Sequence, residues 1–234
     1  MFYLDKFNYL MKTFVIIPAA GSGSRINSKI PKQFIKVAGK EILAYTLEIF
    51  QNNENIDKII VATKPQYFDL ITNLKEKYSF GKIAKIVEGG VKRQDSVYNA
   101  LKNITADKND LIIVHDAARP LLSQSLLNKA IEEAKNSRKI VIAVKARDTL
   151  IEGNDYVDGY LDRKKIYYAQ TPQIFSFDIL INSMNNAYKD NFVATDESMI
   201  VEKYAGSVKI VEGESINFKI TTDSDLKIFM KIVE

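Results

Sequence analysis

Five short, largely apolar runs, separated by segments with other patterns, constrain the fold of this chain more than any other feature of its sequence. Each run has four or five residues, and apolar side chains occupy adjacent positions in it instead of every second one. Strands with both faces buried have this pattern, which is typical of a parallel sheet covered by helices on both sides. The runs are Phe14–Ile17, Lys58–Ala62, Ile83–Val87, Leu111–Val114 and Ile140–Val144.

Two of the intervening segments place apolar residues at helical spacing. In the first, Val97, Ala100, Leu101 and Ile104 recur at i, i+3, i+4 and i+7. The alternation of strands and helices predicts an α/β fold, doubly wound around a mostly parallel sheet. Ligands of such sheets bind beyond the carboxyl ends of the strands. The second stripe consists of Leu126, Leu127, Ala130, Ile131 and Ala134.

The alternation stops after Val144. Residues 145–168 are polar, lack helical periodicity and contain the turn signals Gly153-Asn154-Asp155 and Asp158-Gly159. We expect them to form a protruding β-arm on a single domain, 1–234, because no linker or repeat divides the chain. Residues 1–10, which precede a second methionine, are either an N-terminal extension or the result of a start codon assigned too early.

The composition excludes several kinds of chemistry. The 234 residues include no cysteine and one histidine, which excludes disulfides, zinc–cysteine sites and thiol nucleophiles. No apolar run approaches the ~20 residues of a membrane span, and no signal peptide is recognisable. We therefore expect a cytoplasmic protein that does not contact a membrane. The net charge of +4 is spread along the chain and favours a small anionic ligand over a nucleic acid.

The first apolar run ends in a loop of small residues, from Pro18 to Arg25. Successive peptide N–H groups in such a loop can bind an anion, and Arg25 and Lys32 add two positive charges. Neither a Walker A sequence nor the third glycine of the dinucleotide fingerprint is present. A plain tight turn would also explain the glycines, but with the two cations the loop favours triphosphate binding.

A second glycine-containing turn, Glu88 to Ser96, follows another apolar run. Gly89 and Gly90 would allow a planar base to approach closely, and the Ser96 hydroxyl could bind the edge of that base. The segment is equally consistent with an ordinary helix start.

A third motif, from Val114 to Pro120, places Asp116 at the tip of an apolar strand. A carboxylate there can bind Mg²⁺ or a polyol hydroxyl, but Asp116 and Arg119 would form an internal salt bridge equally well. His115 is expected to be a hydrogen-bonded structural residue and not a catalytic base.

These motifs, in this order, resemble those of the 2-C-methyl-D-erythritol 4-phosphate cytidylyltransferase family of the non-mevalonate isoprenoid pathway. The resemblance extends from about Thr13 to the C-terminus. Related ribitol 5-phosphate cytidylyltransferases share much of it, but the Pro-Ala-Ala-Gly opening and the Ala117-Ala118 pair favour the first family. The shared motifs are Pro-Ala-Ala-Gly-x-Gly-x-Arg, Pro-Lys-Gln-Phe, Gly-Gly-x-x-Arg-x-x-Ser, His-Asp-Ala-Ala-Arg-Pro, Arg-Asp-Thr, Asp-Arg, Gln-Thr-Pro-Gln and Lys-Ile-Thr.

The resemblance implies an enzyme with a Rossmann-like nucleotidyltransferase sheet that binds CTP and Mg²⁺ and forms a homodimer through its arm. It would transfer the cytidylyl group of CTP to methylerythritol 4-phosphate and release pyrophosphate. Another polyol phosphate as acceptor, or a nucleotide-binding module without turnover, remains an alternative. By position, Arg25, Lys32 and Lys219 would be catalytic; Ala19, Ala20, Gly21, Gly23, Gly90 and Ser96 would bind CTP; and Asp116 (also the candidate Mg²⁺ ligand), Arg119, Thr149, Arg163, Thr171 and Thr195 would bind the acceptor.

Overall fold

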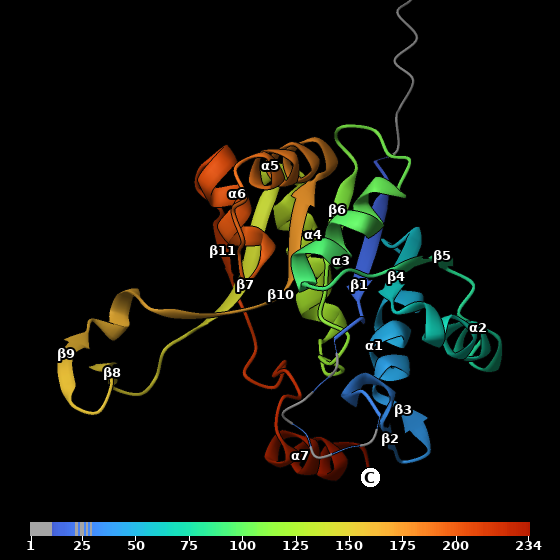
Figure 1. The fold of residues 1–234 in the computed structure, drawn as a ribbon, viewed down its shortest axis with the longest axis horizontal. Coiled ribbons are helices and arrows are strands. Elements are labelled where there is room, and N and C mark those ends of the chain that lie inside the picture. Colours follow the sequence, from blue (N-terminus) through green and yellow to red (C-terminus); the bar gives the residue numbers. More distant parts are fainter. Residues whose placement is uncertain (1–10, 22, 24–25, 27, 29) are drawn as a thin grey trace, which may run out of the picture.

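A computed structural model of the chain describes residues 11–21, 23, 26, 28 and 30–234. Its centre is a seven-stranded sheet with strand order β11-β7-β10-β6-β1-β4-β5 (Figure 1). Six of these strands run in one direction, and β10 is antiparallel to both of its neighbours. The predicted doubly wound, mostly parallel sheet is therefore confirmed. The strands of the sheet are β1 (Thr13–Pro18), β4 (Lys58–Thr63), β5 (Ile83–Glu88), β6 (Leu111–Val114), β7 (Lys139–Lys145), β10 (Tyr167–Ser176) and β11 (Lys209–Glu212).

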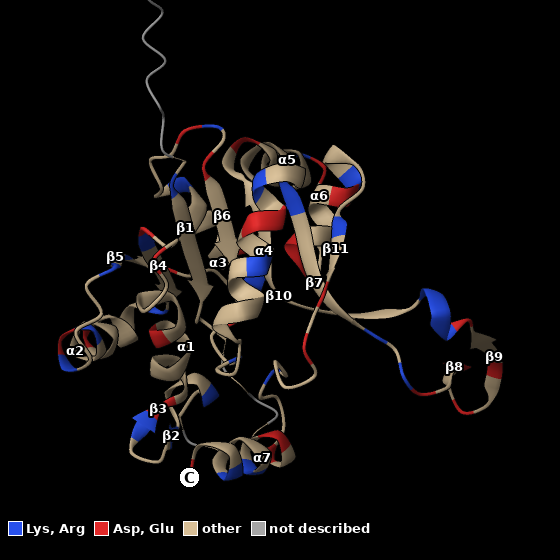
Figure 2. Ribbon diagram, turned by 180° about the vertical axis from the view of Figure 1, so that it is seen from behind, with Lys and Arg blue, Asp and Glu red and all other residues tan. Residues whose placement is uncertain are grey.

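Helices cover both faces of the sheet. Alternate residues of β1 belong to different cores: Val15 and Ile17 pack with α1, α2 and α4, while Phe14 and Ile16 pack with α3, α5 and α6. Accordingly, α3 lies in front of the sheet in Figure 1 and α4 lies in front of it in Figure 2. The helices are α1 (Ile42–Gln51), α2 (Phe68–Lys77), α3 (Arg93–Lys102), α4 (Gln124–Ser137), α5 (Phe177–Lys189), α6 (Glu197–Ala205) and α7 (Asp223–Val233), with three short 3-10 helices, η1 (Lys32–Phe34), η2 (Pro65–Tyr67) and η3 (Arg163–Lys165).

A third, smaller core lies beyond the carboxyl edge of the sheet. There the C-terminal helix α7 packs with Phe229 against Ile42 and against the hairpin of β2 (Lys36–Val37) and β3 (Lys40–Glu41). Ile220, on the segment that leads into α7, is fully buried in the same core. This packing holds the end of the chain close to the loops that follow the central strands.

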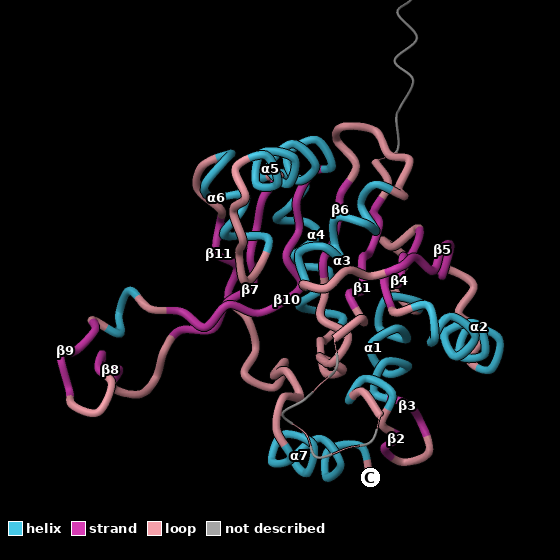
Figure 3. Tube along the Cα trace, in the orientation of Figure 1, coloured by secondary structure: helices cyan, strands magenta, loops and turns pink. Residues whose placement is uncertain are grey.

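Between β7 and β10 the chain leaves the sheet and forms an antiparallel hairpin of β8 (Leu150–Gly153) and β9 (Val157–Leu161). The hairpin lies apart from the body of the molecule in Figures 1 and 3. Lys145 pairs with Tyr167, and Val144 pairs with Tyr168, so both edges of the expected 145–168 segment belong to the central sheet. The part of the chain outside that sheet is therefore 146–166, slightly shorter than predicted.

Candidate functional site

Four segments meet at the carboxyl edge of the sheet and enclose a cavity of about 290 Å³. Three of them follow β1, β5 and β6, and the fourth connects β11 to α7, as the loops of Figure 3 show. This is the edge where parallel strands of α/β sheets present their ligand sites. The described residues that line the cavity are Pro18, Ala19, Ala20, Gly21, Gly23, Lys32, Gln33, Gly90, Val91, Lys92, Arg93, Ser96, Asp116, Ala117, Ala118, Lys219 and Thr221.

Gln33, which lies in η1, is hydrogen-bonded to the first residues of the loop after β1. Its buried side-chain amide donates hydrogen bonds to the carbonyl oxygens of Ala19 (2.7 Å) and Gly21 (2.9 Å). These two hydrogen bonds hold the backbone at Ala19 and Gly21 without a ligand. The same short helix carries Lys32 into the cavity wall.

The turn after β5 has no room for side chains at its two glycines. A Cβ atom on Gly89 would lie 2.5 Å from the Cβ of Ala20, and one on Gly90 would lie 2.1 Å from the Cβ of Asp95. The Gly90 N–H donates to the Ser96 hydroxyl oxygen at 3.1 Å, and that hydroxyl donates to the Lys92 carbonyl. The turn therefore lies flat against the loop after β1, and the two segments form one continuous wall.

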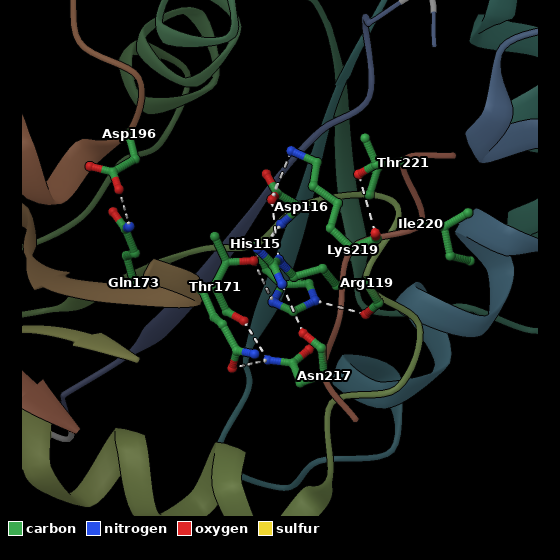
Figure 4. Close-up of polar contacts among 12 residues, drawn as sticks. His115, Asp116, Arg119, Thr171, Gln173, Asp196, Asn217, Lys219, Ile220 and Thr221 are labelled. Atoms are coloured by element: carbon green, nitrogen blue, oxygen red, sulfur yellow. Dashed lines mark hydrogen bonds and ion pairs between the residues drawn. The ribbon is translucent and has the colours of Figure 1, made fainter. Parts of the chain in front are cut away.

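Asp116, two residues after β6, is surrounded by cations, and Figure 4 shows two of them, Arg119 and Lys219. Its Oδ1 accepts from Arg93 Nε at 3.0 Å, and its Oδ2 lies 3.0 Å from Lys219 Nζ and 3.3 Å from Arg119 Nε. Burial alone would raise the pKa of Asp116, but Arg93, Lys219 and Arg119 hold that pKa well below its usual range. Asp116 is therefore ionised, and the internal salt bridge with Arg119 is present.

His115, which is fully buried, supports the loop that carries Asp116. Its Nε2 lies 3.0 Å from the Arg119 carbonyl oxygen, which can only accept, so Nε2 holds the proton. Its Nδ1 then accepts from the Thr171 hydroxyl at 3.2 Å, and that hydroxyl in turn accepts from the Asp116 N–H at 3.0 Å. Burial lowers the pKa of His115 to about 4, so the ring is neutral near pH 7. The expectation of a hydrogen-bonded structural histidine agrees with these contacts.

The segment that carries Lys219 is tied to the same loop. Arg119 Nη1 donates to the Asn217 carbonyl at 2.8 Å, and the Ile220 N–H donates to the Ala118 carbonyl at 2.9 Å. Lys32 Nζ donates to the Ile220 carbonyl at 2.6 Å. As a result, Lys219 and Lys32 reach the cavity from two segments that are fixed to each other.

The predicted site residues divide into two groups in the structure. Ala19, Ala20, Gly21, Gly23, Lys32, Gly90, Ser96, Asp116 and Lys219 line the cavity, whereas Arg25 lies outside the described residues. Arg119 and Thr171 are buried behind Asp116, and Thr195 is exposed just before α6. Thr149 and Arg163 are exposed on the segment that carries the hairpin, where Arg163 Nη1 donates to the Arg147 carbonyl at 2.8 Å. In the structure of this single chain, five of the predicted site residues therefore do not line the cavity: Arg119, Thr149, Arg163, Thr171 and Thr195.

Four residues with a clear place in the site received no role from the sequence. They are Gln33, Arg93, Glu197 and Asn217. Arg93 links two carboxylates, with Nε on Asp116 and with Nη1 at 2.7 Å from both oxygens of Glu197. Asn217 donates to the Thr171 carbonyl at 2.9 Å. Gln33, Arg93 and Asn217 lie in or beside a motif recognised in the sequence, and Glu197 lies two residues after Thr195, so proximity to these positions is the signal that could have identified them.

Asp116 does not fit the role of a metal ligand. Both of its oxygens are engaged by arginine or lysine, and cations at these distances compete with Mg²⁺ for the same lone pairs. Among the described residues, no three histidine or carboxylate side chains gather closely enough to bind a metal ion. The expectation that Asp116 binds Mg²⁺ is therefore not supported by the protein groups around it.

Comparison with known proteins shows which family the chain belongs to. The model of the 2-C-methyl-D-erythritol 4-phosphate cytidylyltransferase family matches residues 13–234. The chain belongs to this family. It is therefore an enzyme, a nucleotidyltransferase. The match begins at β1, as the sequence resemblance predicted.

Relatives with the same printed name cover almost the whole chain. The protein of Clostridioides difficile is 43% identical over 94% of this chain and 92% of its own length. That of Clostridium botulinum strain Loch Maree is 37% identical over 96% and 99%.

Solved structures of the family agree with the fold. The Francisella tularensis enzyme has a TM-score of 0.81 and 36% identity over 93% of this chain and 98% of its own. The Anaerococcus prevotii 4-diphosphocytidyl-2C-methyl-D-erythritol synthase has a TM-score of 0.82 and 30% identity, with 95% and 98% coverage. Within the part of the chain that the structure describes, every helix is too short or too polar to span a bilayer.

Proposed function

We propose that this chain transfers the cytidylyl group of CTP to 2-C-methyl-D-erythritol 4-phosphate, forming 4-diphosphocytidyl-2-C-methyl-D-erythritol and pyrophosphate. The observation that supports this best is the charge of the cavity. Its described lining holds four cations, Lys32, Lys92, Arg93 and Lys219, around one carboxylate, Asp116. Such a cavity attracts polyanions, and it keeps one ionised acceptor for a hydroxyl group.

The proposed reaction needs no protein base. A phosphate oxygen of the acceptor attacks the α-phosphorus of CTP, the bond to the β-phosphate bridging oxygen breaks, and pyrophosphate leaves with that electron pair. The acceptor phosphate is already an anion near pH 7. His115, the one histidine of the chain, is neutral, with both ring nitrogens engaged. The enzyme's task is to align two anions and to stabilise the charge that develops between them.

The roles that we propose for individual residues are those that the family resemblance implies. Ala19, Ala20, Gly21 and Gly23 contact the triphosphate, and Gly90 with Ser96 contacts cytosine. Lys32, Lys219 and Arg25 neutralise the charge at the α-phosphate. Asp116, Arg119, Thr171 and Thr195 shape the acceptor site, and Thr149 with Arg163 completes it from a second subunit.

Magnesium enters this proposal as the counter-ion of the CTP phosphates and not as a resident of the protein, because Asp116 is held by three cations. When bound there, it would screen the triphosphate and the leaving pyrophosphate. A cytoplasmic location fits a reaction that consumes CTP and a chain that contains no cysteine.

The hairpin supports the homodimer that forms part of this proposal. Side chains of β8, β9 and the turn between them are exposed although they are large and apolar, an arrangement that is costly in water and typical of an interface. A second copy of the chain is the simplest partner, because a two-fold axis would cover both hairpins at once. Figure 2 also shows the basic residues of η3, which include Arg163, beside the hairpin. The exposed residues of the hairpin are Ile151, Tyr156, Val157, Tyr160 and Leu161, and Tyr167 and Tyr168 at the start of β10 are exposed as well.

The reaction is tested by incubating the purified chain with CTP, Mg²⁺ and methylerythritol 4-phosphate. We expect pyrophosphate release that depends on the acceptor, together with one product that contains cytidine and two phosphates by mass spectrometry. If CTP binds but no acceptor produces pyrophosphate, the chain is a nucleotide-binding module and the proposal is wrong.

A further inference from the structure

The first turn of α3 is bound to a segment almost a hundred residues later in the chain. Gln94 Nε2 donates to the Phe192 carbonyl at 3.1 Å, and its Oε1 accepts from the Ala194 N–H at 2.9 Å. Asp95 accepts from the Tyr188 hydroxyl at 2.6 Å. The turn that carries Gly90 is therefore attached to the segment that leads to Thr195.

Arg93, the first residue of α3, makes the charged part of this connection. Its Nη1 lies 2.7 Å from both oxygens of Glu197, and its Nε donates to Asp116 at 3.0 Å. Glu197 is fully buried at the start of α6. Burial lowers the pKa of an arginine, but Glu197 and Asp116 together raise the pKa of Arg93, so the guanidinium stays charged.

Two observations separate Arg93 from an ordinary structural ion pair. Arg93 is one of the residues that line the cavity. In addition, its Nη2 is buried without a hydrogen-bond partner, whereas a residue that served only to pair Glu197 would have its donors satisfied. Arg93 thus lines the cavity and, after binding two carboxylates, still has one donor without a hydrogen-bond partner.

We propose that Arg93 is a positioning residue for the acceptor: anchored by Glu197, it fixes the orientation of the Asp116 carboxylate and links it to the cytosine turn. The inference rests on the proposed function, since it concerns the acceptor of that reaction. Arg119 and Lys219 hold Oδ2 of Asp116, and Arg93 is the group bonded to Oδ1. Without Arg93, the carboxylate keeps its charge partners on one oxygen only and can rotate about its Cβ–Cγ bond.

The test compares steady-state kinetics of Arg93→Met, Glu197→Gln and the double variant with those of the wild type. Removal of one charged hydrogen bond predicts a rise of roughly 10- to 100-fold in the KM for the acceptor in Arg93→Met. The KM for CTP and kcat should change by less than about threefold on the same view, since Arg93 acts here on acceptor binding. Arg138→Met, which removes an arginine paired with Asp178 on the surface, is the matched control and should leave both KM values unchanged.

The double variant distinguishes a positioning role of Arg93 from a role in which Arg93 only neutralises the charge of Glu197. A buried charge left without its partner destabilises a protein, and removal of both charges restores much of the stability. We expect the double variant to regain the melting temperature lost in Arg93→Met but to keep the raised acceptor KM. If the double variant regains the wild-type acceptor KM, Arg93 serves only to neutralise Glu197 and the inference is wrong.

Arg93→Lys keeps the test decisive if Arg93→Met does not fold. Lysine retains the charge but cannot contact two carboxylates with a planar fork, so the acceptor KM should still rise. A wild-type acceptor KM in this variant would overturn the inference. Wild-type turnover is measured first: if the wild type itself does not use methylerythritol phosphate, the proposed function has failed, whereas normal variants of an active wild type refute the role of Arg93 alone.

Discussion

At the scale of single residues, the site is organised around the buried carboxylate of Asp116 and the neutral ring of His115. Three cations keep Asp116 ionised, while the hydrogen bonds of His115 to the Arg119 carbonyl and to Thr171 fix the loop that carries both residues. The two residues are adjacent in sequence, but burial favours the neutral form of His115, whereas nearby cations favour the charged form of Asp116. A charged and a neutral titratable group can coexist there because each is bonded to the partners that its own state requires.

The burial of His115 as a neutral ring predicts how the free energy of unfolding depends on pH. Its pKa is about 4 in the folded chain, below the ordinary value of 6.5, so the unfolded state binds more protons between these limits. The free energy of unfolding should therefore decrease as pH falls through this window, by roughly 2 to 3 kcal/mol from His115 between pH 7.5 and 4.5. Urea unfolding of the wild type and of His115→Gln checks this.

The glutamine variant is a clean comparison because the chain has no second histidine. Its amide can accept from Thr171 and donate to the Arg119 carbonyl, but it does not titrate in this range. The wild type should lose more stability than the variant on acidification. Equal losses in the two proteins would show that His115 is not buried as a neutral ring.

Lys32 is the described cation whose removal should affect the chemical step most. Its ammonium group would face charge that increases during transfer, so Lys32→Ala should lower kcat by on the order of 10²-fold. The KM for CTP should change much less. A variant with nearly normal kcat and only a raised KM would make Lys32 a ground-state binder, contrary to our assignment.

Some residue roles followed from the sequence and others required the fold. Asp116 and Lys219 were expected in one site, because their motifs belong to one family pattern. The pairing of Arg93 with Glu197 joins residues 104 positions apart, and local sequence contains no information about which partner a buried arginine will meet. For the same reason, Asp116 was predicted equally as a salt-bridge partner and as a ligand.

At the scale of elements, the five predicted strands all occur, because continuous apolar runs are a strong local signal. The inserted antiparallel strand β10 was not predicted. It contains Gln170, Thr171 and Gln173, which are buried although they are polar, and which form hydrogen bonds with distant segments. Tertiary contacts, not periodicity, make this segment a strand.

The hairpin element leads to a test of the dimer. Lys32→Ala and Arg163→Ala, each of which we expect to have little activity alone, are unfolded, mixed and refolded together. If each site takes Arg163 from the other chain, half of the dimers are mixed and each has one intact site, so activity should return to roughly a quarter of wild type. No recovery would mean that both residues act within one chain, and a monomer in solution would refute the dimer directly.

At the scale of the whole molecule, the sheet brings segments from residue 18 to residue 221 to one edge, where the described lining of the cavity holds four cations and one carboxylate. The net charge of +4 gave little indication of such a concentration. A polyanionic substrate pair explains why the lining holds four cations around one carboxylate.

The most direct measurement of the central claim is kcat/KM for pyrophosphate release with CTP and Mg²⁺, using methylerythritol 4-phosphate beside ribitol 5-phosphate. The account predicts acceptor-dependent release and a higher kcat/KM with methylerythritol 4-phosphate. A higher value with ribitol 5-phosphate would contradict it.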